Sequence, residues 1–368
     1  MNARPCEPIL LIKAKAIPPG FRITQEQLGK HGGTFLGNFL DQIIMTPSSG
    51  ELLVVALGGN ALFRRGEKGT FDEQSKNIVS ASHHLANLVE EGYRLVITHG
   101  NGPQVGATIL RHEAGKKEYD IPPLPMHVAV AETQGFIGYL IQQSLRSELK
   151  RRRIERNVVT LITRVIVDKN DPELKNPTKP IGPFLAPEEV SMAKKSHPEY
   201  TFFEDKSRGG WRRVVPSPDP IRIAIAEQSS IRKLLDEKCI VVACGGGGIP
   251  IIEEDGWRAQ GIEAVIDKDL AGQRLATLIQ ARKYVMLTDV DGAYLNFGSQ
   301  NQKRIESITV GEVRGYFEQG YFAEGSMAPK ILAAIRFVEA GGKEAIIAEL
   351  SEIMEAVSGR KGTHVRPS

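Results

Sequence analysis

Uninterrupted apolar runs alternate with segments of helical periodicity along the chain from residue 51 onward. Residues 52–57 form a run rich in Val and Leu, which is typical of a strand buried on both faces of a parallel sheet. In residues 72–91 the apolar side chains recur at helical spacing. The same reasoning predicts further strands at 94–98, 157–167, 239–243, 283–287 and 345–348, and helices at 127–153, 219–236, 326–341 and 351–358. This alternation predicts an α/β fold whose parallel sheet is covered by helices on both faces.

Two parts of the chain depart from this pattern. Residues 1–50 hold only the short apolar run Ile9–Ile12, and Pro and Gly pairs interrupt the rest, so we expect a poorly ordered N-terminal extension. Residues 51–368 then form the main domain. Within it, residues 168–215 are rich in Pro, Lys and aromatic side chains and lack the alternation, which predicts an inserted, protruding lid subdomain.

Composition narrows the class of protein. Of 368 residues, 41% are hydrophobic and 25% charged, which is ordinary for a globular protein. The net charge of +3 is too small to indicate nucleic acid or an anionic membrane as a partner. Cys6, Cys239 and Cys244 form no disulfide framework, and no Cys/His spacing indicates a metal site, so we expect a cytoplasmic protein.

Glycine-rich segments follow three of the predicted strands, so the backbone there is little covered by side chains. The stretches are Gly58-Gly59-Asn60, Gly100-Asn101-Gly102 and Gly245-Gly246-Gly247-Gly248. Ligands of open α/β sheets bind beyond the carboxyl ends of the strands, and exposed backbone amides there can hold an anion. Three such loops in one sheet therefore predict a shared anion-binding crevice.

Two lysines lie close to predicted helix starts. Lys268 stands between two carboxylates in Asp267-Lys268-Asp269, and Lys330 falls in the first turn of the next-to-last helix. A lysine in a first turn opposes the helix dipole, which is tolerable if a phosphate lies between them.

The chain has neither a P-loop nor a protein-kinase catalytic loop, and Gly100-x-Gly102-x-x-x-Gly106 is a weak match to a dinucleotide motif.

At this point residues 51–368 resemble the amino acid kinase family. The resemblance rests on ValAlaLeuGlyGlyAsnAla (55–61), ThrHisGlyAsnGlyProGlnVal (98–105), ThrGlnGlyPheIleGlyTyr (133–139), AsnProThrLysProIleGlyProPhe (176–184), TrpArgArgValValProSerPro (211–218), CysGlyGlyGlyGlyIlePro (244–250), AlaValIleAspLysAspLeuAla (264–271), LeuThrAspValAspGlyAlaTyr (287–294) and GlySerMetAlaProLys (325–330). The first fifty residues have no counterpart in the family.

The resemblance implies a three-layer αβα sandwich around a mainly parallel sheet, with the inserted subdomain, in a homodimer. It further implies reversible Mg²⁺-dependent phosphoryl transfer between ATP and carbamate, giving ADP and carbamoyl phosphate, in the context of arginine catabolism with ATP formation. Two alternatives stay open: a catalytically silent sensor that binds a nucleotide or carbamoyl phosphate, and a kinase of another small carboxylate.

The resemblance also implies roles for individual residues. The backbones of the three loops would hold carbamate and the transferring phosphoryl group. The residues implied in catalysis are Lys179, Lys268, Asp269 and Lys330; those implied in substrate binding are Gly58, Gly59, Asn60, Gly100, Asn101, Gly245, Gly246, Gly247 and Gly248; and those implied in nucleotide binding are Lys268, Asp289, Tyr294, Met327 and Lys330. No protein residue is implied as a metal ligand.

Overall fold

A large, mostly parallel sheet organises the computed structural model, which describes residues 50–59, 62–63, 66–205, 209–219, 224–323 and 326–368. Its strands, in spatial order, are β15 (Ser307–Thr309), β17 (Thr363–Arg366), β16 (Glu344–Glu349), β12 (Lys283–Thr288), β1 (Leu52–Leu57), β2 (Arg94–His99), β9 (Ile240–Val242) and β3 (Val158–Thr160). Among these neighbours only β16 and β17 run antiparallel. The predicted α/β class with a mainly parallel sheet is therefore confirmed.

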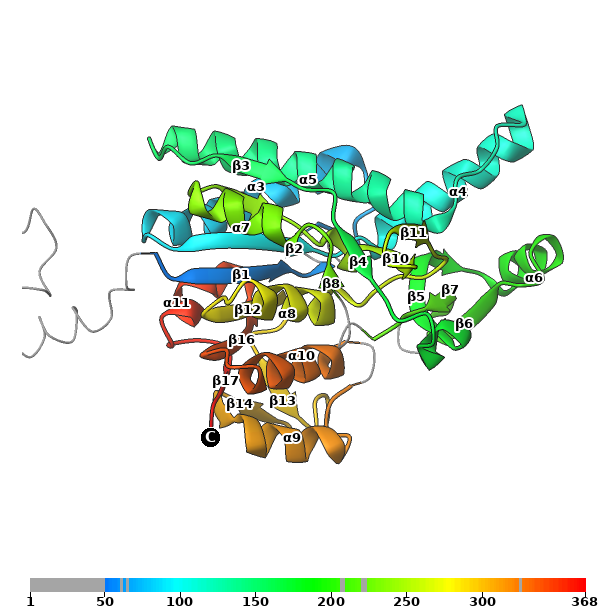
Figure 1. The fold of residues 1–368 in the computed structure, drawn as a ribbon. Coiled ribbons are helices and arrows are strands. Elements are labelled where there is room, and N and C mark those ends of the chain that lie inside the picture. The colour runs from blue at the N-terminus through cyan, green and yellow to red at the C-terminus, as the bar shows by residue number, and fades with distance from the viewer. Residues whose placement is uncertain (1–49, 60–61, 64–65, 206–208, 220–223, 324–325) are drawn as a thin grey trace, which may run out of the picture. The chain divides into compact units, whose positions relative to one another are not determined.

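Helices cover both faces of this sheet (Figure 1), and every side chain of β1 is therefore buried. Leu53, Val55 and Leu57 pack on one face with α3 (Phe71–Glu90), α5 (Met126–Arg151) and α11 (Ile353–Val357). The alternate side chains of β1 pack on the other face with α7 (Gln228–Asp236), α8 (Lys268–Leu278) and α10 (Met327–Glu339). Figure 1 shows α3 and α5 on the opposite side of β1 from α8 and α10.

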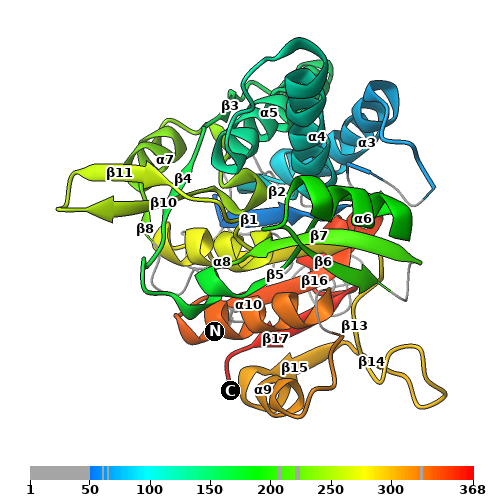
Figure 2. The same ribbon diagram turned by 90° about the vertical axis from the view of Figure 1, so that its right-hand side faces the viewer.

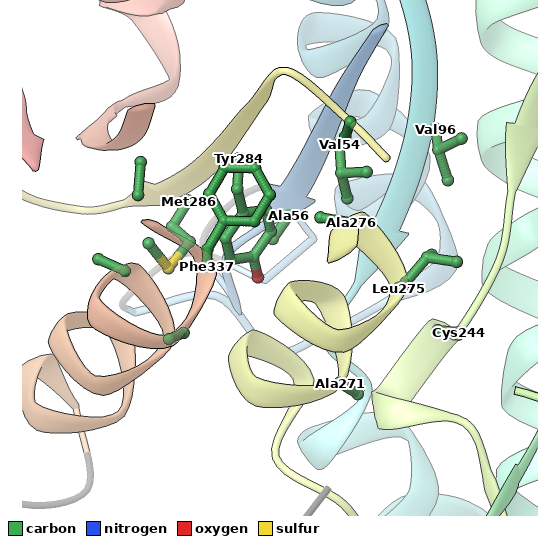
Figure 3. Packing of buried hydrophobic residues seen from close by; sticks show 14 of the residues in the cluster. Val54, Ala56, Val96, Cys244, Ala271, Leu275, Ala276, Tyr284, Met286 and Phe337 are labelled. Atoms are coloured by element: carbon green, nitrogen blue, oxygen red, sulfur yellow. The ribbon is translucent and has the colours of Figure 1, made fainter. Parts of the chain in front are cut away.

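An aromatic pair joins α10 and α8 to β12. The rings of Tyr284 and Phe337 lie with their centroids 5.9 Å apart, and both side chains are fully buried (Figure 3). The Tyr284 hydroxyl donates a hydrogen bond of 2.8 Å to the backbone carbonyl of Asp269 in the first turn of α8. These core contacts thus fix the position of the N-terminus of α8, which contributes Lys268 and Asp269 to the candidate site.

The inserted segment forms a lobe beyond the carboxyl end of β1 (Figures 1 and 2). It comprises η2 (Pro172–Lys175), β5 (Pro177–Leu185), α6 (Pro187–Ser196), β6 (Thr201–Asp205) and β7 (Gly210–Pro216), and its three strands pair antiparallel in the order β5-β7-β6. The base of the lobe is packed, since Ile181 and Val215 are buried in a cluster with Val105 of α4 (Gly102–Tyr119).

The remaining elements extend the sheet system. A second sheet consists of β11 (Arg258–Gly261), β10 (Ile249–Glu254), β4 (Arg164–Ile166) and β8 (Ala224–Ile225). Smaller elements are η4 (Gly245–Gly247), β13 (Ala293–Leu295), β14 (Lys303–Ile305), α9 (Val310–Glu318) and η5 (Leu350–Glu352). Residues 1–49, to which the expected extension belongs, lie outside the described residues, so the predicted boundary at residue 50 stays a prediction. Of the helices described, none has the length and apolar character needed to cross a membrane.

The single strand predicted over 157–167 is wrong, because the segment enters two sheets. Residues 158–160 form β3 in the main sheet, and residues 164–166 form β4 in the second sheet. Between them, the backbone N–H of Thr163 donates to the side chain of Gln134 (2.8 Å) and its hydroxyl accepts from the backbone of Cys244 (3.1 Å). The backbone N–H of Thr163 therefore has a side-chain partner instead of a strand partner, while its carbonyl accepts from the backbone N–H of Ile249 (2.9 Å).

The helix predicted over 219–236 also begins later than expected. Residues 224–225 form β8, and α7 starts only at Gln228. Glu227 precedes α7 and accepts hydrogen bonds from both the backbone N–H (2.7 Å) and Nε (2.8 Å) of Arg164. This contact holds residue 227 beside β4, so the helix starts after it.

A buried cluster of charges lies at the opposite end of the sheet from the lobe. Glu344 at the start of β16 contacts Lys283 Nζ (3.1 Å), His364 Nδ1 (3.0 Å) and Arg366 Nε (2.7 Å). Burial would raise the pKa of Glu344, but these three partners, His364 first, lower it to about 2. Lys283 also donates to the backbone carbonyl of Val357 (2.8 Å).

We therefore expect Glu344→Gln to lower the free energy of unfolding by about 3 kcal/mol at pH 7, because it leaves the buried ammonium of Lys283 without its carboxylate. A carboxylate with a lowered folded-state pKa stabilises above its unfolded pKa, and this contribution disappears as the pH falls from about 4.5 to about 2. Urea denaturation should show a smaller difference between wild type and variant at pH 3 than at pH 7. A difference independent of pH would contradict this account, and Glu306→Gln, at an 81% exposed side chain, serves as the control.

Candidate active site

The three glycine-containing loops meet at one edge of the main sheet. They follow β1, β2 and β9, which are consecutive neighbours in the sheet and run parallel. Because parallel strands end on the same side, the loops surround one crevice. The predicted convergence of Gly58, Gly59, Gly100, Asn101 and Gly245 to Gly248 is thus present in the structure. Asn60 lies outside the described residues.

Close contacts explain why several of these positions carry no side chain. A Cβ atom at Gly246 would lie 2.1 Å from Nδ2 of Asn101, and Gly246 has a φ of +65°. A Cβ atom at Gly100 would lie 3.2 Å from Cδ of Lys268. The aliphatic stem of Lys268 therefore passes directly over the loop that follows β2, which brings a cation to the crevice.

Buried polar side chains hold the loop after β9 in place. Gln134 of α5 donates to the carbonyls of Gly245 (3.0 Å) and Thr163 (3.2 Å), and Thr98 donates to the carbonyl of Cys244 (2.9 Å). His99 lies against Gly245, where a Cβ atom would come within 2.2 Å of its Nε2. Burial lowers the pKa of His99 to about 4, so its ring is neutral near pH 7. Gln134, Thr98 and His99 were given no role from the sequence.

Lys268 and Lys330 share one carboxylate in the crevice. Lys268 is the first residue of α8, and its Nζ lies 2.6 Å from Oδ1 of Asp269. Lys330 lies in the first turn of α10, and its Nζ is 3.1 Å from Oδ2 of the same residue. All three side chains are largely buried. The structure thus brings together three of the four residues implied in catalysis.

The fourth residue, Lys179 of β5, reaches the same place from the lobe. Its Nζ pairs with Oδ2 of Asp267, and Oδ1 of Asp267 caps α8 by accepting from the backbone N–H of Asp269 (2.9 Å). Asp267 was noted in the sequence as a neighbour of Lys268 but was given no function. In the structure it links the lobe to the start of α8.

Burial and ion pairing oppose each other in this cluster. Burial would raise the pKa of Asp269, but Lys268 and Lys330 outweigh it and hold this pKa below its usual range. Burial lowers the pKa of Lys268 despite the attraction of Asp269. For Lys330 burial acts in the same direction, but Asp269 outweighs it and raises the pKa. The carboxylate of Asp269 is therefore ionised.

A cavity of about 170 Å³ adjoins the cluster. Its lining residues come from all three loops, from α4, from the lobe and from the segment before α8: Gly59, Leu62, Gly100, Asn101, Gly102, Pro103, Gln104, Val105, Lys179, Pro180, Ile181, Gly246, Val265, Ile266 and Lys268. The start of α4 contributes the positive end of the helix dipole. Lysines, amides and helix dipole together make this a place for a small anion.

Of the residues implied in nucleotide binding, Lys268 and Lys330 belong to the cluster, whereas Asp289, Tyr294 and Met327 are not among the residues that line the cavity. Asp289 follows β12, Tyr294 lies in β13, and Met327 is the first residue of α10, one turn before Lys330. The Tyr294 hydroxyl donates to Oδ1 of Asp291 (2.6 Å). Their role in binding a nucleotide stays a prediction.

Within the described residues, no three His, Cys, Asp or Glu side chains are grouped so as to hold a metal ion. The two carboxylates of the cluster, Asp267 and Asp269, are already paired with lysines. Such a donor set fits a magnesium ion that arrives on the phosphates of a nucleotide, because Mg²⁺ keeps several waters and needs few protein ligands.

Comparison with known proteins gives one consistent result. The model of the amino acid kinase family matches residues 51–349. The chain is 51% identical over 318 residues to the carbamate kinase of Pyrococcus furiosus, covering 86% of this chain and 100% of that protein. It is 45% identical over 317 residues to the carbamate kinase of Trichomonas vaginalis, covering 86% and 99%. Among solved structures, carbamate kinase from Giardia lamblia bound to AMP-PNP matches with a TM-score of 0.79 and 39% identity, covering 88% and 100%.

The pairing of Asp269 with two lysines predicts a loss of stability when its charge is removed. Asp269→Asn leaves two buried ammonium groups without their counter-charge, and breaking such a pair costs about 3 kcal/mol of unfolding free energy. The double variant Asp269→Asn with Lys268→Met should recover part of this loss, since it removes one of the two cations. Urea denaturation at pH 7 measures both effects. Asp291→Asn, at a half-exposed carboxylate, is the control, and a loss at Asp269 no larger than at Asp291 would contradict the ion-pair account.

Proposed function

The chain belongs to the amino acid kinase family, as the sequence predicted, and we propose from this premise that it is a carbamate kinase. It catalyses reversible phosphoryl transfer between ATP and carbamate, giving ADP and carbamoyl phosphate. The observation that carries the proposal is the convergence of three lysines on Asp267 and Asp269, beside a cavity that Lys179 and Lys268 line. Identity of 45% to 51% with carbamate kinases over most of the chain supports this choice of substrate.

Phosphoryl transfer of this kind depends on positioning and on charge rather than on covalent chemistry. The carboxylate of carbamate is already anionic, so its attack on the γ-phosphoryl group needs no general base. The neutral, buried His99 is consistent with this mechanism. The difficulty is to hold two anions in line, since unit charges about 4 Å apart interact by roughly 4 kcal/mol at an effective dielectric of about 20.

The lysines meet this requirement from two sides. Lys268 and Lys330 lie at the starts of different helices and are both oriented by Asp269, so their ammonium groups can flank the transferring group. The backbone amides of the three loops add further donors. A magnesium ion brought by the nucleotide would supply additional positive charge at the β- and γ-phosphates. Asp289, Tyr294 and Met327 would line the nucleotide pocket.

The lobe at 168–215 would act as a lid over this site. Lys179 is a residue of β5, so its contact with the cluster depends on the position of the lobe. The lobe contacts α4 at Gly182, which packs against Gly106. A Cβ atom at Gly106 would lie 1.9 Å from the Cα of Gly182, so the two backbones are in direct contact. Ile181 and Val215 are buried against Val105 of α4, so closure in this proposal would turn the lobe about this packed base.

Several further properties are part of the proposal. A homodimer is supported by the free edge of β3 and by the exposed Tyr139 and Ile162 near it, and sedimentation velocity of the purified protein would test it. The unpaired Cys239 and Cys244 support a reducing, cytoplasmic location. A role in arginine catabolism, with ATP formation, is part of the proposal because the resemblance to the family implies it. We further propose that residues 1–50 are dispensable for catalysis, because every implied site residue lies after them.

A coupled assay of ATP formed from carbamoyl phosphate and ADP with Mg²⁺ tests the function. We expect turnover that depends on both substrates. Carbamoyl phosphate binding without turnover would indicate the silent sensor instead. Activity with acetyl or another acyl phosphate well above that with carbamoyl phosphate would indicate a kinase of another small carboxylate. A chain that starts at Gly50 should keep kcat/KM within about threefold if the extension is dispensable.

Lys268→Met and Lys330→Met should each lower kcat by about 10² to 10³, since each removes a preorganised cation from the transferring phosphoryl group. Interactions made mainly in the transition state affect kcat more than KM. Lys283 is unsuitable as a comparison lysine, because it is buried against Glu344. Lys343→Met, at an exposed lysine before β16, is the better control and should change kcat by less than about threefold. Near-full kcat in either site variant, with folding intact, would contradict the assigned phosphoryl position.

If the lobe is a lid, ligands should protect it from proteolysis. Cleavage within residues 168–215 should slow when ADP and carbamoyl phosphate are added together, because closure stabilises the contact of Lys179 with the site. Limited trypsinolysis followed by mass spectrometry measures the cleavage rate. Cleavage that stays equally fast at saturating ligand would argue against closure.

A further inference from the structure

The proposed substrate has one group that the lysines and backbone amides of the site cannot bind. In carbamate and carbamoyl phosphate the carboxyl and phosphate oxygens accept hydrogen bonds, whereas the amino group donates them. The cations and N–H groups that surround the cavity are all donors. Recognition of the amino group therefore requires an acceptor with a free lone pair, and this requirement rests on the proposed function.

A chain of amides fixes the orientation of one candidate, Gln104 in the first turn of α4. Gln74 of α3 donates from Nε2 to the carbonyl of Gly69 (2.8 Å), which can only accept. The Oε1 atom of Gln74 therefore faces Gln104 and accepts from its Nε2 (2.9 Å). Gln104 must use its nitrogen as the donor in this contact, so its Oε1 is left as the acceptor.

That oxygen has no partner within the part of the chain that the structure describes. Gln104 is only 7% exposed, and its Oε1 is buried without a hydrogen bond. Leaving a buried acceptor unsatisfied is costly, and native proteins rarely do so without a reason. Gln104 also lines the cavity together with Gly59, Asn101 and Lys268. A donor on a bound ligand would satisfy it.

The other buried side-chain amides around the site already make hydrogen bonds within the protein. Gln134 uses both ends of its amide, donating to Thr163 and Gly245 and accepting from the backbone N–H of Thr163. Asn101 donates to the hydroxyl of Thr133 (2.9 Å), and its amide lies against Gly246. Among these three side chains, Gln104 is the one whose oxygen is both buried and unpaired.

We propose that Gln104 determines specificity for the substrate's amino group, with its Oε1 accepting a hydrogen bond from the NH₂ of carbamate or carbamoyl phosphate. Gln74 acts as a positioning residue that holds the amide of Gln104 in this orientation. The pair would distinguish a carbamoyl from an acetyl group, which has nearly the same size but carries a methyl group in place of NH₂. A site built to bind a polar group discriminates strongly against an analogue that lacks it.

The test compares two phosphates in wild type and variants. The KM of carbamoyl phosphate is measured in the ATP-forming assay, and acetyl phosphate is measured as a competitor, so its Ki is obtained whether or not it is turned over. In Gln104→Met the ratio of Ki to KM should fall about tenfold, because carbamoyl phosphate loses a hydrogen bond and acetyl phosphate does not. Gln74→Met should lower the ratio by about threefold, although Gln74 does not contact the substrate.

Gln134→Met is the matched control, since it alters a buried glutamine whose partners are backbone groups. It should weaken the binding of both phosphates and leave their ratio unchanged. A ratio that is also unchanged in Gln104→Met would overturn the assignment; if that variant fails to fold, an unchanged ratio in Gln74→Met would do so. Absence of ATP formation by wild type would instead refute the proposed function, and the two failures are thereby distinguished.

Discussion

Two ammonium groups, carried by the first turns of α8 and α10, share the single carboxylate of Asp269 in a largely buried position. Lysines placed at helix N-termini oppose the helix dipoles, and burial adds a further cost to each charge. Asp269 compensates part of this cost and keeps both cations in place. The cluster has two cations for one carboxylate at this point, so it is best satisfied when an anion is bound.

Contacts in the surrounding fold hold the residues of this cluster in fixed positions. Tyr284 fixes the start of α8 by its hydrogen bond to the carbonyl of Asp269, and its ring packs on Phe337 of α10 (Figure 3). Gly100 leaves room for the stem of Lys268, while Gly246 leaves room for the amide of Asn101. The glycines are thus needed as much for the packing of charged and polar side chains as for their own backbone amides.

The fold class and much of the site could be predicted from the sequence, because both depend on local patterns. The buried strand 52–57, the glycines that follow three strands, and the lysines at two helix starts are all visible in short segments. The double pairing of Asp269, the contact of Lys179 with Asp267, and the unpaired oxygen of Gln104 depend on segments far apart in the chain. The split of residues 157–167 between two sheets was missed for the same reason, since Gln134 and Cys244 supply the partners of Thr163.

The most direct test of the account is a crystal structure of the protein with ADP, Mg²⁺, carbamate and aluminium fluoride, which mimics the transferring phosphoryl group. We expect Nζ of Lys268 and of Lys330 each to lie within about 3.2 Å of the fluoride ligands, on different sides of the group. Both lysines should keep contact with Asp269. A structure in which aluminium fluoride binds away from either ammonium group would contradict the central role given to this lysine pair.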